Sequence, residues 1–158
     1  MRTDRCGDLR ADDVDRTVTL CGWVDRRREH GEHLAFVDLR DRSGVVQLVI
    51  DGAHDLRSEY VLQITGNVRL RPNDTANDSL PTGAIEIDVE QVAILSTSDP
   101  LPFPLDDRTE VDEVLRLRHR YLDLRRSRLQ RNLEAVSYTH LRAHETDSYL
   151  VCRLLLEK

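Results

Sequence analysis

Alternating apolar and polar residues dominate the first hundred positions of the chain. Such alternation, rich in β-branched side chains, is typical of strands that bury one face. It predicts five strands, at residues 17–24, 34–39, 45–50, 60–70 and 85–95. A charged loop over residues 25–33 follows the first strand, and residues 52–58, after the third, leave room for only one or two helical turns.

The order of these elements predicts the fold class. Three strands, a short helix and two more strands are the order of a five-stranded OB-fold barrel, so residues 1–100 are expected to form an all-β domain of this kind. Such barrels bind oligonucleotides on the face of their second and third strands and in the adjoining loops. The pattern therefore favours a protein that binds single-stranded nucleic acid.

The pattern changes after the predicted barrel. Residues 101–109 contain Pro102 and Pro104, show no periodicity and are expected to be an extended linker. Residues 110–134 repeat apolar side chains at helical spacing, which predicts a helical segment. Between these positions lie seven arginines, Arg116, Arg118, Arg120, Arg125, Arg126, Arg128 and Arg131. They either form a solvated helix face or contact RNA phosphates or another domain.

Composition narrows the class of protein. The chain has 158 residues, of which 39% are hydrophobic and 33% charged, as in globular domains. Its formal net charge of −6 argues against a uniformly basic surface but allows a local basic patch. No apolar run approaches the roughly 20 residues of a membrane span. Three cysteines without metal-ligand spacing predict neither a disulfide scaffold nor a metal site. We expect a cytoplasmic protein that binds no membrane.

The candidate chemistry lies on the predicted barrel. Arg26, Arg27 and Arg28 follow the first strand, where their guanidinium groups either grip phosphates or are solvated. Phe36 lies on the second strand, and it is either a core aromatic or a platform on which a base stacks. An arginine cluster beside an exposed aromatic ring would suit single-stranded nucleic acid.

Two polar residues lie on strands that are otherwise largely apolar. Gln47 interrupts an apolar run and either presents a donor and an acceptor to a base edge or is a solvated strand residue. Glu86, on the fifth predicted strand, can accept a hydrogen bond from a base amino group. An amide and a carboxylate added to arginine and phenylalanine would make the barrel a reader of single-stranded bases.

Several segments together resemble a known family. They are TLCGWV at residues 19–24, the arginine triplet, FVDLRDR at 36–42, GVVQ at 44–47 and LRHRYLDLRR at 117–126. Their order closely resembles the N-terminal part of bacterial aspartyl-tRNA synthetases, and the resemblance covers residues 1–134. In that family the barrel binds the tRNA anticodon, and residues 110–134 would begin the hinge and catalytic-domain helices.

The resemblance implies a role for each candidate residue. Phe36 would stack on the central U of the anticodon, and Gln47 would hydrogen-bond that base. Arg26 and Arg28 would hold the backbone of the anticodon loop, and Glu86 would read a flanking base. The implied partner is the anticodon loop of tRNA-Asp.

His30 bears on a second tRNA. In the family, enzymes that accept only tRNA-Asp often carry leucine at this position, and those that also accept tRNA-Asn often carry histidine. The two anticodons differ only in their third base, C against U. The resemblance therefore implies that His30 contributes to tolerance at that base, whereas the alternative is a solvated loop residue.

The resemblance also separates binding from catalysis. The full-length enzymes, which are expected to be homodimers, attach aspartate to tRNA with ATP and Mg²⁺ in a later domain that carries class II signature motifs. Those motifs do not occur in this sequence. We therefore expect no catalytic residue, no cofactor and no ligase activity in this fragment. A free-standing OB-fold module for single-stranded nucleic acid is the alternative, although residues 117–126 would have no role in it.

Residues 135–158 differ in character from the rest. Their sequence corresponds codon by codon to the translation of a transposase mosaic end and its flanking sequencing adapter. We therefore expect this tail to be non-native. The metal-ligand spacing of His140 and His144 is expected to carry no function for the same reason.

Overall fold

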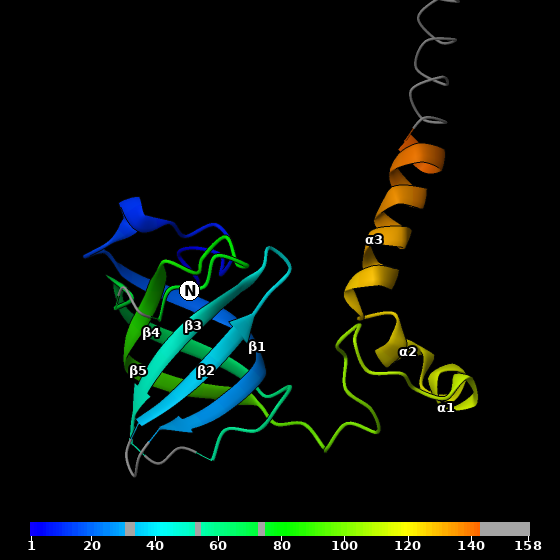
Figure 1. The fold of residues 1–158 in the computed structure, drawn as a ribbon, viewed down its shortest axis with the longest axis horizontal. Coiled ribbons are helices and arrows are strands. Elements are labelled where there is room, and N and C mark those ends of the chain that lie inside the picture. The colour runs from blue at the N-terminus through cyan, green and yellow to red at the C-terminus, as the bar shows by residue number, and fades with distance from the viewer. Residues whose placement is uncertain (31–33, 53–54, 73–74, 143–158) are drawn as a thin grey trace, which may run out of the picture. The chain divides into compact units, whose positions relative to one another are not determined.

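The computed structural model of the chain describes residues 1–30, 34–52, 55–72 and 75–142. Two compact units divide the chain, Met1–Pro100 and Leu101–Lys158. The first contains the strands and the second the helices (Figure 1). No helix in the described ranges is long and apolar enough to span a membrane.

A closed five-stranded barrel forms the first unit (Figure 1). A short 3₁₀ turn, Ala11–Asp13, precedes the strands β1 (Thr17–His30), β2 (Leu34–Arg40), β3 (Val45–Asp51), β4 (Val61–Leu70) and β5 (Ile85–Ser96). Their spatial order is β1-β2-β3-β5-β4. Neighbouring strands are antiparallel except for β3 and β5, which are parallel. The predicted OB-fold barrel is confirmed.

The alternating pattern sets the inner and outer faces of the barrel. On β2, the side chains of Ala35, Val37 and Leu39 are buried, whereas Phe36 and Asp38 between them are half-buried. The inward-facing residues of the strands form one apolar core with Cys6, Leu9 and Leu56. The alternate positions therefore present their side chains on the outside of the barrel.

Two sequence predictions about the barrel are wrong in detail. Strand β1 continues through Arg26 and Arg28 to His30, although residues 25–33 were expected to form a loop. These charged residues stay in a strand because they pair with β2 beyond an irregularity at Asp25. The short helix expected within residues 52–58 is also absent from residues 55–58, where Leu56 packs into the core instead.

An aspartate between β2 and β3 ties the N-terminal segment to the barrel. Asp41 Oδ2 accepts a hydrogen bond of 2.9 Å from the Cys6 N–H, while Asp41 Oδ1 accepts bonds of 2.7 and 3.2 Å from the N–H groups of Ser43 and Gly44. Ser43 Oγ in turn accepts the Gly7 N–H at 2.7 Å. Only glycine fits at position 7, because a Cβ atom there would lie 2.3 Å from the Ser43 carbonyl oxygen.

The second unit contains three short helices rather than one continuous helical segment. They are α1 (Glu113–Arg118), α2 (Arg120–Asp123) and α3 (Ser127–Val136), and a π-helical turn, Ser137–Arg142, follows. Phe103, Leu105 and Leu122 form a small core. Residues 101–109, expected to be an extended linker, therefore pack against the helices. In the tail, residues 135–139 are exposed, and residues 143–158 lie outside the described part of the chain.

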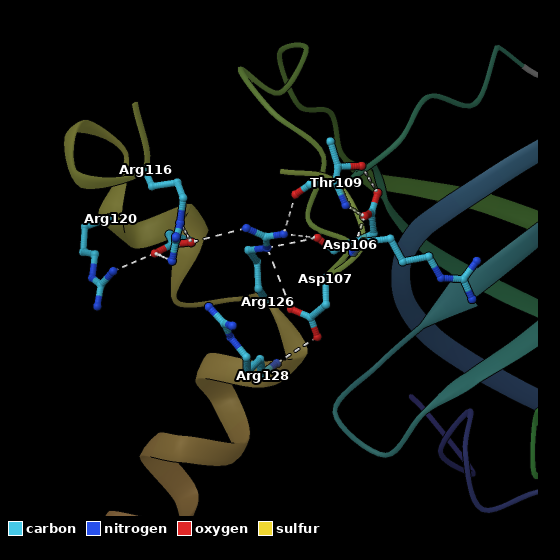
Figure 2. Close-up of polar contacts among 9 residues, drawn as sticks. Asp106, Asp107, Thr109, Arg116, Arg120, Arg126 and Arg128 are labelled. Atoms are coloured by element: carbon cyan, nitrogen blue, oxygen red, sulfur yellow. Dashed lines mark hydrogen bonds and ion pairs between the residues drawn. The ribbon is translucent and has the colours of Figure 1, made fainter. Parts of the chain in front are cut away.

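Three of the helical arginines form structural contacts (Figure 2). The carboxylate of Asp123 is fully buried and accepts hydrogen bonds from Arg116 Nε at 2.9 Å and Arg120 Nη1 at 2.6 Å. The hydrogen bonds from Arg116 hold the pKa of Asp123 below its usual value. Arg126 donates to the carbonyl oxygens of Asp106 and Thr109. These three side chains therefore stabilise the second unit. This role differs from both sequence interpretations, a solvated helix face and a contact with RNA phosphates or another domain.

Acid should weaken the Asp41 tether of the first unit. Burial alone would raise the pKa of Asp41, but the hydrogen bonds from Ser43, Cys6 and Gly44 outweigh it and lower the pKa. A lowered pKa means that this stabilisation is complete above the unfolded value of about 3.9 and is lost as the pH falls through the lower folded value. Asp41→Asn should therefore cost about 1.5–3 kcal/mol of unfolding free energy at neutral pH, and the deficit should shrink in acid.

Urea unfolding of both proteins between neutral and acidic pH measures this deficit. Asp55→Asn is the control, because the Asp55 side chain is 74% exposed and, among the described residues, its polar contacts are with Arg57. The control should stay within about 0.5 kcal/mol of the parent protein throughout. An Asp41→Asn deficit that is independent of pH would show that the carboxylate charge is not what holds the segment.

Candidate nucleic-acid interface

The strand register brings the predicted site residues to one outer face of the barrel. Arg28 on β1 pairs with Phe36 on β2, and Arg26 pairs with Asp38, which in turn pairs with Gln47 on β3. Each of these residues alternates with core-facing neighbours on its strand, although Gln47 is itself largely covered from solvent. The outer face of β1, β2 and β3 therefore carries two arginines, a phenylalanine and an amide side by side.

Glu86 joins this face through β5. The parallel pairing of Leu48 with Ile87 sets Glu86 beside Gln47, and the antiparallel pairing of β4 with β5 sets Arg69 opposite Glu86. Strands far apart in the sequence thus bring their polar side chains together on the barrel surface.

Phe36 lies on the surface of the barrel and not in its core. Its neighbours Ala35 and Val37 point inward and are buried, whereas Phe36 is half-buried. Arg28 and Val49 are its partners on the two adjacent strands. A partly accessible ring beside a guanidinium group is suited to stacking with a base.

A continuous chain of hydrogen bonds crosses this face. We call it the outer-face network, and it consists of Asp38, Arg28, Gln47, Glu86, Arg69 and Asp88. Arg28 Nη2 donates to Asp38 Oδ1 at 2.8 Å and to Gln47 Oε1 at 3.3 Å. Gln47 Nε2 donates to Glu86 Oε2 at 3.0 Å. Arg69 closes the chain, donating from Nε to Glu86 Oε1 at 2.9 Å and from Nη1 to Asp88 Oδ2 at 3.0 Å.

The centre of the outer-face network is shielded from water. Gln47 is 8% exposed and Glu86 only 4%, so Gln47 is not the solvated strand residue that was one of its two interpretations. Buried polar groups of this kind are normally satisfied by partners, and these two satisfy one another. The arrangement therefore holds an amide and a carboxylate in fixed positions.

Burial and nearby charges shift the pKa values of two residues close to the centre of the network, Asp38 and Arg71. Burial raises the pKa of Asp38, although the Arg28 guanidinium opposes the shift. Burial lowers the pKa of Arg71, which the carboxylates of Glu86 and Asp38 oppose. Arg71 is itself buried and donates from Nε to the Ile85 carbonyl oxygen at 2.8 Å. A buried guanidinium thus lies close to the carboxylates at the centre of the site.

Two of the predicted residues stand apart from the network. Arg26 is exposed on the same face, where its guanidinium group is accessible to a ligand. His30 ends β1, and its backbone pairs with that of Leu34. The side chain of His30 and all of His33 lie outside what the structure describes.

Sequence reasoning missed Asp38, Arg69 and Arg71. Asp38 and Arg69 could have been found by alternation, since Asp38 lies two residues after Phe36 and Arg69 follows the inward-facing Val68. Arg71 lies just beyond the end of β4, where alternation no longer applies, and only the fold places it near Glu86. Among the described residues, no group of three or more His, Cys, Asp or Glu side chains is arranged to hold a metal ion.

The second unit offers a different kind of hollow. It has a volume of about 400 Å³ and is lined mainly by polar residues, including Asp107, Arg116, Arg126 and Arg128. The guanidinium groups of Arg116 and Arg126 are already bound within the unit, and Asp107 accepts the Arg128 N–H at 3.0 Å (Figure 2). This hollow lacks a stacking aromatic among its lining residues, so the barrel face is the better candidate for base recognition.

Sequence comparison agrees with the barrel. Residues 18–95 match the tRNA anti-codon family model, described as an OB-fold nucleic acid binding domain. The aspartate–tRNA(Asp/Asn) ligase of Pseudarthrobacter chlorophenolicus is 54% identical over 136 residues, covering 84% of this chain and 22% of that protein. The ligase of the same name from Thermobifida fusca is 49% identical over 148 residues, covering 92% of this chain and 25% of that protein. The chain thus spans about a quarter of the length of these relatives.

Solved structures share the fold. An aspartyl-tRNA synthetase from Entamoeba histolytica superposes with a TM-score of 0.76 at 19% identity, covering 94% of this chain and 38% of that one. An asparaginyl-tRNA synthetase from Pyrococcus horikoshii gives a TM-score of 0.64 at 24% identity, covering 79% of this chain and 29% of that one. The family model and the curated relatives show that the chain contains an anticodon-binding OB-fold domain and is homologous to about a quarter of the length of bacterial aspartate–tRNA(Asp/Asn) ligases.

Proposed function

We propose that the outer face of the barrel binds the anticodon loop of tRNA-Asp and of tRNA-Asn. The observation that carries this proposal is the grouping on one face of a half-buried Phe36, the exposed Arg26 and the buried, hydrogen-bonded amide of Gln47. Stacking, phosphate contact and base-edge recognition are the three interactions by which proteins read single-stranded RNA.

Each side chain has a role in this proposal. Phe36 stacks on the central U of the anticodon, and Gln47 hydrogen-bonds its edge. Arg26 and Arg28 contact the phosphates of the loop, and the remaining lone pairs of Glu86 accept a hydrogen bond from a flanking base. The supporting evidence is the strand register that gathers these residues, together with the similarity of the barrel to anticodon-binding domains.

The relatives' names suggest the wider context. Both are called aspartate–tRNA(Asp/Asn) ligase, and this chain corresponds to about a quarter of each. In our proposal the full protein attaches aspartate to these two tRNAs in the cytoplasm and acts as a homodimer. ATP and Mg²⁺ would act in the remaining three quarters, and the barrel of residues 1–100 would supply anticodon recognition.

Replacing the stacking residue tests the proposal directly. Phe36→Ala should weaken binding of a stem-loop with the anticodon GUC by about 1–3 kcal/mol, the range for one lost base stack. Fluorescence titration of the 158-residue chain at fixed salt measures this change, with circular dichroism to confirm that the barrel remains folded. Phe36→Tyr is the matched control, because it keeps the aromatic face and should retain most of the affinity. If Phe36→Ala binds as tightly as the parent, the ring does not stack on the RNA.

His30 provides a second test, at the third anticodon base. The parent chain should bind GUC and GUU stem-loops with similar affinity, since the relatives' names include both tRNAs. His30→Leu removes a hydrogen-bonding group and should shift the ratio toward GUC by about 1 kcal/mol, the low end for discrimination by one base contact. Titration of both stem-loops measures the ratio.

Glu29→Gln is the control for His30→Leu. Its side chain is 70% exposed on the same strand, one residue away, so its loss of charge should change both affinities alike and leave the ratio as it was. A parent chain that already rejects GUU, or a ratio untouched by His30→Leu, would contradict a role for His30.

A further inference from the structure

The amide of Gln47 lies between two groups of opposite hydrogen-bonding character. Its Nε2 donates to the Glu86 carboxylate at 3.0 Å, and its Oε1 accepts from the Arg28 guanidinium at 3.3 Å. An ionised carboxylate can only accept hydrogen bonds, and a guanidinium group can only donate them. The two neighbours therefore allow one orientation of the amide and oppose the other.

A flip of the amide would reverse both contacts at once. Oε1 of Gln47 would then face the Glu86 carboxylate, and Nε2 would face Arg28, so that two acceptors and two donors would oppose each other. Because Glu86 is 4% exposed and Gln47 8%, water is poorly placed to relieve this conflict. The side chain that contacts the base thus presents a fixed arrangement of donor and acceptor.

A fixed amide distinguishes the two pyrimidines. Uracil offers an N3–H donor next to an O4 acceptor, whereas cytosine offers an N3 acceptor next to an N4 amino donor. Oxygen and nitrogen of one amide can pair with the uracil edge in one orientation and with the cytosine edge only after a flip. We infer that Glu86 is a positioning residue, which selects U over C at the central base by fixing the orientation of the Gln47 amide. This inference rests on the proposed anticodon function.

The surroundings hold Glu86 in place for this role. Its other oxygen, Oε1, accepts from Arg69 Nε at 2.9 Å, and Arg69 is anchored in turn to Asp88 at 3.0 Å. The Arg71 guanidinium adds positive charge close to this carboxylate. Both oxygens of Glu86 are therefore bound within the barrel, and its link to the central base runs through Gln47.

The test compares stem-loops that differ only at the central anticodon base, GUC and GCC. Contacts to flanking bases cancel in the ratio of the two dissociation constants, including any that Glu86 itself makes. The parent chain should prefer GUC by roughly tenfold or more, in the range for one bidentate base contact. Glu86→Gln keeps the shape of the side chain but lets it donate as well as accept, and it should lower that preference about fivefold or more.

A double-mutant cycle shows whether Glu86 acts through Gln47. Glu86→Gln should change the GUC-to-GCC ratio in the parent but not in a Gln47→Met background, where the amide is absent. Glu90→Gln is the matched control, because Glu90 is an exposed carboxylate on the same strand that accepts a hydrogen bond from Asn67, outside the outer-face network, so the ratio should stay unchanged.

Arg69→Met provides a second variant in case Glu86→Gln fails to fold. Arg69 is 44% exposed, and its loss frees one oxygen of Glu86, so part of the preference for U should disappear. A parent chain that binds neither stem-loop better than a scrambled loop would overturn the proposed function itself. A clear preference for U that survives Glu86→Gln and Arg69→Met would leave that function intact and overturn only the positioning role.

Discussion

The register of β2 between β1 and β3 is the constraint on which the binding face depends. Side chains alternate along a strand, so a slip of one residue would turn Phe36 and Asp38 into the core and bring Val37 to the surface. The buried side chains of Ala35, Val37 and Leu39 oppose such a slip, because each would lose its apolar environment. The same residues that stabilise the barrel therefore fix the position of its site.

The outer-face network converts this register into a preorganised site. Gln47 and Glu86 are buried, and a buried polar group without a partner costs about 1–3 kcal/mol. Each therefore depends on the other for stability, and Arg28 and Arg69 complete the chain on its two sides. A ligand that meets side chains already held in place loses less conformational freedom on binding. Stability and recognition thus draw on the same hydrogen bonds.

The local sequence pattern was sufficient to predict the strands of the barrel, but not the full length of β1 or the contacts between distant residues. Sequence pattern located all five strands, because strands such as β2 and β4 bury one face and expose the other. It could not locate the end of β1, whose charged residues remain in a strand through pairing with β2. Nor could it predict the contact between Gln47 and Glu86, which are 39 residues apart and meet through the parallel pairing of β3 with β5. The roles of the site residues toward RNA remain predictions.

The helical character of residues 110–134 was predicted, but the breaks between its helices were not. Helical spacing identified residues 110–134 but gave no sign of the breaks around α2, where the buried Asp123 gathers Arg116 and Arg120. Arginines that looked available for RNA are engaged in this ion-pair cluster. The second unit is thus organised by charge as much as by its small apolar core of Phe103, Leu105 and Leu122.

Solution NMR of the isotopically labelled chain, titrated with a GUC anticodon stem-loop, tests the location of the RNA site most directly. We expect the largest shift changes on the outer face of the barrel, in the side-chain amide of Gln47, the ring of Phe36 and the backbone around Arg28. Signals from α1, α2 and α3 should change little. Recognition by the barrel face would be contradicted if the largest chemical-shift changes occurred at Arg108 and Arg128, which line the hollow of the second unit, while the signals of Gln47 and Phe36 stayed unchanged.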